Sequence, residues 1–107
     1  MVKSMSRSVT NNRYIILYDI SSNKLRGKIE KTLCDYGMRI QYSVFSVTVS
    51  SKGYRRLVAE ISRLVSRHPS LCESTDSVFS FKLRSDETID SIYGKSLAAN
   101  ENYLMIG

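Results

Sequence analysis

NRYIILYDISSNKLRGK, residues 12–28, is the stretch that decides the fold of this chain. Five apolar or aromatic residues follow one another from Tyr14 to Tyr18, and such a continuous run is typical of a strand buried on both faces. We expect this strand over residues 13–19. Asp19 comes at its end, and the Ser-Ser-Asn that follows supplies turn and helix N-cap chemistry. A carboxylate therefore directly follows the most apolar segment of the chain.

The residues after this turn predict a helix and then two strands. Apolar side chains recur at helical spacing over residues 24–36, and Gly37 stands where a helix C-terminal glycine belongs. β-Branched and aromatic residues dominate the positions that follow. Their alternation slips by one residue between Val44 and Phe45, and a slip reverses which face is buried. We therefore expect two short strands that meet near residues 42–45.

A second helix and two further strands complete the pattern. Ser51 can cap a helix whose apolar stripe runs to His68 and Pro69, which end it. Residues 77–83 alternate, which is typical of a half-buried strand. Its apolar face carries Phe79, Phe81 and Leu83. An apolar run over residues 102–106 predicts one more strand, after a weakly patterned stretch.

The order of these elements predicts an α+β fold. Strand, helix, strand, strand, helix and strand form the ferredoxin-like β-α-β-β-α-β sandwich, an antiparallel sheet with two helices on one face. The additional C-terminal strand follows it. We expect a flexible basic tail over residues 1–11, the ferredoxin-like core over residues 12–83, and a linker and strand over residues 84–107 that pack on the other protomer of a homodimer. This fold serves many functions, so it does not decide the function alone.

The charge of the chain is uneven, and this predicts a polyanionic partner. The net charge is +6 over 107 residues, but residues 1–67 hold thirteen lysines and arginines against four acids. Nucleic acid is the commonest partner of such a basic region, and a merely solubilising surface is the alternative. No apolar run approaches the roughly 18 residues that cross a bilayer. We therefore expect a cytoplasmic protein that does not bind a membrane.

Two roles are open for Asp19 from the residues alone. Its carboxylate can cap the helix that follows, which needs no metal. Alternatively, a two-fold axis between two copies places Asp19 opposite its own counterpart, and two carboxylates can hold a hard divalent ion through their oxygens.

A longer segment carries a resemblance to a known family. YIILYDISSNKLRGKIEKTLCDYGMRIQYSVFSV, residues 14–47, resembles the small CRISPR-associated endoribonuclease family, the dimeric partner of the CRISPR spacer-acquisition integrase. Its signature has three parts: Tyr-Asp-Ile at residues 18–20, a basic helix closed by Tyr-Gly at residues 36–37, and Arg-Ile-Gln-Tyr-Ser-Val-Phe at residues 39–45. The resemblance extends over about residues 12–106.

This resemblance implies the function and the site residues. It implies a metal-dependent endonuclease in which Asp19 is catalytic and binds Mg²⁺ or Mn²⁺. It implies a homodimer that binds double-stranded DNA or single-stranded RNA and joins the integrase in a heterotetrameric or heterohexameric complex. The expected nucleic-acid-binding residues of the matched segment are Arg26, Lys28, Arg39, Ser43 and Phe45. Four more lie on the second helix, namely Lys52, Arg56, Arg63 and Arg67.

Each of these residues also has a plainer interpretation. Arg26 and Arg39 can pair with Glu30 or Asp35 instead of phosphate, and Phe45 can fill the dimer core instead of stacking a base. The four basic residues of the second helix can be a solvated face. We keep two functions, a nuclease at paired Asp19 residues and a non-catalytic hub that binds duplex DNA and the integrase. Because basic residues are dispersed and catalytic groups are few, the residues favour the hub. The alternative is a non-enzymatic ferredoxin-like regulatory or nucleic-acid-binding dimer unrelated to CRISPR.

Overall fold

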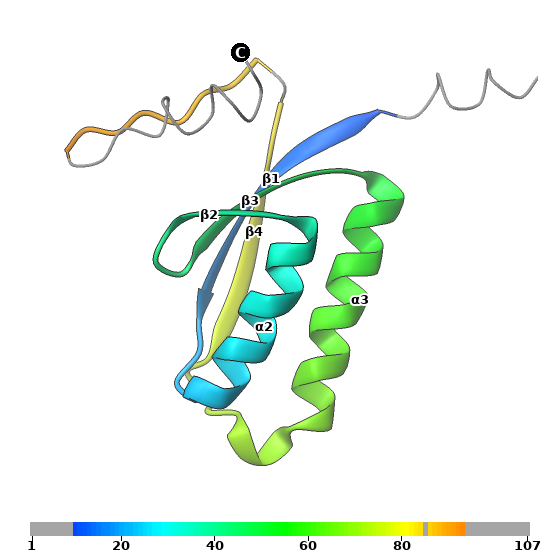
Figure 1. Ribbon diagram of the computed structural model, residues 1–107, viewed down its shortest axis with the longest axis vertical. Helices are drawn as coiled ribbons and strands as arrows, with labels where there is room; N and C mark the ends of the chain where they lie inside the picture. The colour runs from blue at the N-terminus through cyan, green and yellow to red at the C-terminus, as the bar shows by residue number, and fades with distance from the viewer. Residues whose placement is uncertain (1–9, 85, 94–107) are drawn as a thin grey trace, which may run out of the picture.

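A four-stranded antiparallel sheet, with both helices on one of its faces, forms the fold in the computed structural model (Figure 1). The structure describes residues 10–84 and 86–93. The strands lie in the order β2-β3-β1-β4. The elements are β1 (Asn11–Asp19), α2 (Asn23–Tyr36), β2 (Gly37–Gln41), β3 (Val44–Ser50), α3 (Ser51–Arg67), the 3-10 helix η1 (Pro69–Leu71) and β4 (Ser77–Leu83). The predicted ferredoxin-like order is confirmed, and the strand expected over residues 102–106 lies outside the described residues.

β1 is a central strand, but within one chain only one of its faces is covered. Tyr14, Ile16 and Tyr18 are buried towards the helices, whereas Ile15 and Leu17 are half-buried on the other face. The expectation of a strand buried on both faces is therefore wrong for the single chain. We call the sheet face away from the helices the open face.

α2 begins at Asn23, one residue before the predicted start, and ends at the predicted Tyr36, although its end has another physical basis. The backbone N–H of Leu25 donates to the Ser22 side chain at 3.1 Å, so Ser22 is the N-cap. Gly37 has φ −165°, which is extended backbone and not the left-handed cap expected from the sequence. A Cβ on Gly37 would lie 2.1 Å from the carbonyl oxygen of Ser46. Glycine is needed there because β3 approaches so closely.

The predicted slip between two strands is confirmed as a tight turn. Tyr42 and Ser43 join β2 to β3, and the pairing of the two strands shifts between Arg39 and Gln41. Ser43 has φ 69°, in the left-handed region that non-glycine residues seldom adopt. The carbonyl of Ser43 accepts a hydrogen bond from the backbone N–H of Tyr18 at 3.1 Å. This contact holds the turn beside the end of β1.

α3 is longer than α2 and is fixed to the sheet by its apolar stripe. Ser50 caps it, one residue before the predicted Ser51, by accepting from the backbone N–H of Gly53 at 3.1 Å. Leu57 and Ile61 are buried against the sheet. The ring of Tyr54 stacks on Tyr14 of β1, with 4.1 Å between the centroids. The helix ends at Arg67, as His68 and Pro69 predict. Within the described ranges, none of the helices is long and apolar enough to cross a membrane.

β4 is an edge strand whose apolar face is turned away from the helices. Phe79 and Phe81 are 60% and 57% exposed, while Val78, which points to the helix side, packs on the core. Leu17 lies opposite Phe79 and Ile15 lies opposite Phe81 in the ladder between β1 and β4. The alternation correctly predicted which side chains share a face. However, the helices cover the other face, so these phenylalanines are not buried in this chain.

Candidate functional site

Asp19 lies at the end of β1 with its carboxylate exposed. It is paired with Ser77 of β4 and follows Tyr18, which points to the helix side, so Asp19 belongs to the open face. Ser22 caps α2, so the helix does not need Asp19 as its N-cap. Within the described residues, the Asp19 carboxylate makes no hydrogen bond or ion pair. No described residue therefore engages this acid, and it does not have the capping role.

A second acid, which sequence reasoning missed, lies at the turn after Asp19. The two carboxylate oxygens of Asp76 accept from the backbone N–H groups of Ser21 and Glu73, both at 2.9 Å. These two hydrogen bonds hold the pKa of Asp76 below its usual range, and the bond from Glu73 has the larger effect. Since both oxygens are engaged, Asp76 ties the turn after β1 to the loop before β4. No local sequence pattern predicts the contact with Ser21, because the two residues are 55 positions apart.

The donor set of one chain is small for a metal ion. Over residues 10–84 and 86–93, no group of three or more His, Cys, Asp or Glu side chains could hold a metal. Asp19 alone offers two carboxylate oxygens, whereas a hard divalent ion takes six or more oxygen ligands, waters included. A second carboxylate from another molecule would enlarge the donor set that the described residues offer.

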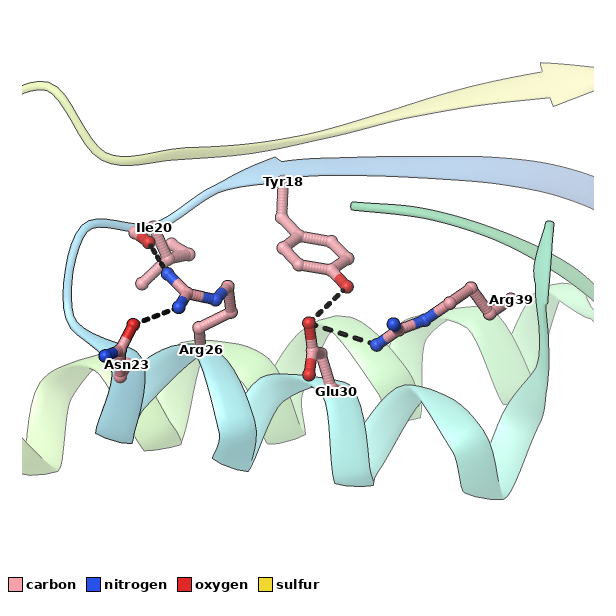
Figure 2. A network of polar contacts seen from close by, with 6 residues as sticks. All are labelled: Tyr18, Ile20, Asn23, Arg26, Glu30 and Arg39. Carbon is pink, nitrogen blue, oxygen red and sulfur yellow. Dashed lines mark hydrogen bonds and ion pairs between the residues drawn. The ribbon is translucent and has the colours of Figure 1, made fainter. Parts of the chain in front are cut away.

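Arg26 is held over the turn between β1 and α2. Its Nη1 donates to the carbonyl oxygen of Ile20 at 2.7 Å, and its Nη2 donates to the side-chain oxygen of Asn23 (Figure 2). The alternative of an ion pair with Glu30 or Asp35 is therefore wrong for Arg26. The guanidinium is thus bonded to the residue that follows Asp19 in the chain, and no described residue bonds its Nε. Lys28, two residues later on α2, is half-buried.

Glu30 of α2 is the centre of a second polar network (Figure 2). It accepts a hydrogen bond from the Tyr18 hydroxyl at 2.7 Å and pairs with Arg39 of β2 at 3.1 Å. The ion-pair alternative is thus confirmed for Arg39. The Arg39 guanidinium also lies 5.5 Å from the ring centre of Phe45, a cation–π contact. Because 42% of its side chain remains exposed, Arg39 can still meet an anion from outside.

Phe45 does not have the position that its expected role requires. Its side chain is completely buried among the helix-facing side chains of the sheet. This burial leaves no ring face for a nucleobase, so the base-stacking role does not fit the structure. Phe45 fills the core of its own protomer instead. Ser43, from the same segment, is half-buried in the turn beside the end of β1.

The network of Glu30 predicts a loss of stability at alkaline pH. Burial, with the hydrogen bond to Glu30 and its charge, raises the pKa of Tyr18 from 10.0 to about 12. Above pH 10 the unfolded chain loses this proton while the folded chain keeps it. The contribution of Tyr18 to the free energy of unfolding is therefore complete below pH 10 and falls up to about pH 12.

Urea unfolding of Tyr18→Phe across this range checks the prediction. The variant is expected to lose less stability between pH 10 and 12 than the wild type does. Glu30→Gln should have an intermediate slope, because it removes the charge but keeps a hydrogen-bond acceptor. An unchanged slope in Tyr18→Phe would contradict the assignment.

The basic residues expected on α3 form an exposed surface. Lys52, Arg56, Arg63 and Arg67 are all exposed. Arg63 and Arg67 also border a cleft of about 180 Å³ between the two helices, with Thr32 and Glu60 on its wall. On α2, sequence reasoning selected Arg26 and Lys28, although Lys24 and Lys31 stand at helical spacing with Lys28. That spacing was the signal that could have found them.

The family of this chain follows from comparison with known proteins. The sequence model of the family described as "CRISPR associated protein Cas2" matches residues 12–89. The chain belongs to the Cas2 family. This match confirms the resemblance predicted from the segment that holds Asp19, Arg39 and Ser43. It also removes the reason to consider a dimer unrelated to CRISPR.

Curated members of the Cas2 family match about half of this chain. "CRISPR-associated endoribonuclease Cas2 4" of Rhodospirillum rubrum is 48% identical over 54 residues, which are 50% of this chain and 44% of that protein. "CRISPR-associated endoribonuclease Cas2 1" of Chloroflexus aurantiacus is 42% identical over 52 residues, 49% of this chain and 56% of that protein. The chain spans about half the length of the curated relatives that it matches.

Solved structures of the Cas2 family share the fold. A chain of the structure described as "Partial Cas6-RT-Cas1--Cas2 complex" is 27% identical, with a TM-score of 0.67 over 81% of this chain and 97% of that chain. A chain described as "Crystal structure of cas2" is 21% identical, with a TM-score of 0.54 over 81% of this chain and 91% of that chain, and supports the fold alone.

Proposed function

We propose that this protein acts in CRISPR spacer acquisition, as a homodimer that binds double-stranded DNA and holds the integrase. Family membership supports the process, and the similar chain from a complex described with both Cas1 and Cas2 supports an integrase partner. The observation that carries the proposal is the open face of the sheet. It presents two exposed phenylalanines on the face that also holds Asp19.

The homodimer is proposed to form through this open face. Phe79 and Phe81 expose more than half of their side chains, next to Leu17 and Ile15 of the neighbouring strand. Such contiguous apolar surface marks an interaction site. A second copy related by a two-fold axis would cover the phenylalanines of both chains. The same arrangement would bring in the second Asp19 that a metal site requires.

The edge of the sheet offers a second contact between protomers. β4 lies at the edge, and a cleft of about 200 Å³ runs beside it, lined by apolar residues of α3 and the sheet. The lining includes Ile16, Leu57, Val58, Ile61 and Val78. We propose that residues 102–106 of the other protomer add a strand here, with their apolar side chains in the cleft. Those residues lie outside the described part of the chain, so this stays a prediction.

Duplex DNA is proposed to lie along the basic surfaces of the helices. Side chains on exposed helix faces can follow a phosphate backbone without reading bases, as a hub requires. Arg56 and Arg63 are exposed two turns apart on α3, and Arg63 borders the cleft between the helices. These two residues are therefore the best test of the surface.

Charge reversal of Arg56 and Arg63 to Glu is expected to weaken duplex binding equally for unrelated sequences. The log–log salt dependence should flatten by about one unit for each lost phosphate contact. Fluorescence anisotropy over a salt series measures both quantities, and a spacer-integration assay with the integrase follows the consequence. The matched control reverses Lys82 and Arg84, which removes the same charge outside the helices. Equal losses in both pairs would show that net charge and not this helix face binds DNA.

A second candidate function is metal-dependent endonuclease activity. The observation in its favour is the exposed Asp19 carboxylate, which α2 does not use as a cap. Asp19 from each protomer would hold Mg²⁺ or Mn²⁺, with waters completing the ligand set. When bound, such an ion lowers the pKa of a bound water and polarises a phosphodiester. Arg26 and the exposed part of Arg39, which both lie on the helix side of the sheet, would neutralise phosphate charge.

A further inference from the structure

We propose that Tyr42 is the side chain on which this protein stacks a base of a single strand whose backbone lies at Asp19. The inference deepens the proposed nucleic-acid binding and rests on it. It requires neither cleavage nor the integrase. The chemical class of the ligand is single-stranded nucleic acid, and the ring of Tyr42 would take one of its bases.

The position of Tyr42 follows from the register of the sheet. Leu17 of β1 lies opposite Val44 of β3. The next step along both strands is the hydrogen bond from the backbone N–H of Tyr18 to the carbonyl of Ser43 at 3.1 Å. Tyr42 precedes Ser43 in this turn, so it follows closely on the end of β1 that carries Asp19. The turn between β2 and β3 therefore lies at the same end of the sheet as the acid.

The exposure of Tyr42 distinguishes it from the other aromatic residue of the segment. Tyr42 is 68% exposed, whereas Phe45 is completely buried. Tyr18, which also lies at this end of β1, is buried and bonded to Glu30. Tyr42 thus offers a ring face at this level of the sheet, and a base can stack on it without any change in the core.

The surroundings of Tyr42 add the charge that a single strand needs. Single-strand sites combine aromatic platforms with cations that follow the backbone. Arg39, three residues before Tyr42, exposes 42% of its side chain although Glu30 pairs with it. Arg26 is held at the same end of the sheet by the carbonyl of Ile20, the residue that follows Asp19. A strand at this end of the sheet would therefore meet the ring of Tyr42 and, on the helix side, two guanidinium groups.

The turn itself is built to hold the ring in place. Ser43 adopts φ 69°, which costs conformational energy in a residue other than glycine. The hydrogen bond from Tyr18 fixes this conformation to a central strand. An aromatic residue on a fixed turn loses little freedom when a base stacks on it, which favours binding.

Binding of short oligonucleotides to Tyr42→Ser tests the proposal, in an Asp19→Asn background so that no strand is cut. Single-stranded RNA and DNA are each used in two forms, with all bases and with abasic sites. Tyr42→Ser is expected to weaken binding of the complete strands by roughly tenfold and to leave binding of the abasic strands unchanged. Tyr42→Phe keeps the ring and should bind both within about twofold of the parent. The RNA and DNA arms identify which strand is preferred.

The other outcomes overturn the inference. Equal weakening for complete and abasic strands, or weakening in Tyr42→Phe, would mean that Tyr42 acts through its hydroxyl or through the turn. A change in oligomeric state by light scattering would make Tyr42 a dimer contact. If the parent binds duplex DNA but no single strand, the inference fails while the proposed function stands. If it binds no nucleic acid of either kind, both fail.

Discussion

Asp19→Asn is expected to abolish metal-dependent cleavage while duplex binding and spacer integration stay close to wild type. The amide keeps the size of the side chain but removes the charge that a divalent ion needs. One substitution removes this charge from both protomers, because the proposed site joins two copies. We expect cleavage to fall by more than about a hundredfold, an effect that even the loss of an outer-shell partner can reach. Cleavage of labelled RNA and DNA with and without Mg²⁺ measures it.

Asp86→Asn is the matched control for this experiment. Asp86 is exposed and pairs with Arg84 at 3.5 Å, outside the sheet and helices. It should leave cleavage unchanged. Cleavage that survives in Asp19→Asn would remove Asp19 from the metal site. Loss of integration by a folded, dimeric Asp19→Asn protein would instead indicate that catalysis at Asp19 is essential, against the hub.

Phe79→Ser and Phe81→Ser are each expected to dissociate the homodimer without unfolding the protomer. Truncation of a buried phenylalanine costs about 3–5 kcal/mol, and a two-fold axis places each substitution in the interface twice. The dimer dissociation constant should therefore rise by at least about a thousandfold. The protomer should remain folded, because both side chains are largely exposed within it. Light scattering over a concentration series and thermal unfolding measure the two quantities.

Val65→Ser is the matched control for the open face. Val65 is also an exposed apolar residue, but it lies on α3, on the other side of the sheet from Phe79 and Phe81. The dimer should tolerate this change. A wild-type protein that is monomeric at micromolar concentration would contradict the dimer and, with it, the paired Asp19 site. A Phe81→Ser protein that dimerises as tightly as wild type would assign the interface to another surface.

The local elements were predictable because their signals lie within a few residues of one another. Ser22 caps α2 three residues from its bonding partner, and Pro69 ends α3 by its own geometry. The slip of alternation near Val44 correctly predicted the turn between two strands. The resemblance of the segment around Asp19 and Ser43 likewise led to the right family.

The candidate site was predictable in part. The sequence indicated Asp19 and the basic side chains, but it left the pairing of Arg26 and Arg39 open. The structure pairs Arg39 with Glu30 and binds Arg26 to a carbonyl oxygen instead. In the structure Asp76 also accepts a hydrogen bond from Ser21, which lies 55 positions away in the sequence. Local spacing does not determine such contacts, because they depend on where distant segments meet.

The sequence by itself determined the order of the elements, their ends and which side chains share a face of a strand, because these depend on periodicity and on steric preferences of single residues. Only the tertiary structure decided which of the two faces is covered. Both helices pack on the same side of the sheet, so Phe45 becomes core while Phe79 and Phe81 remain exposed. The same packing of distant segments left Tyr42, and not Phe45, exposed at the end of the sheet where β1 ends.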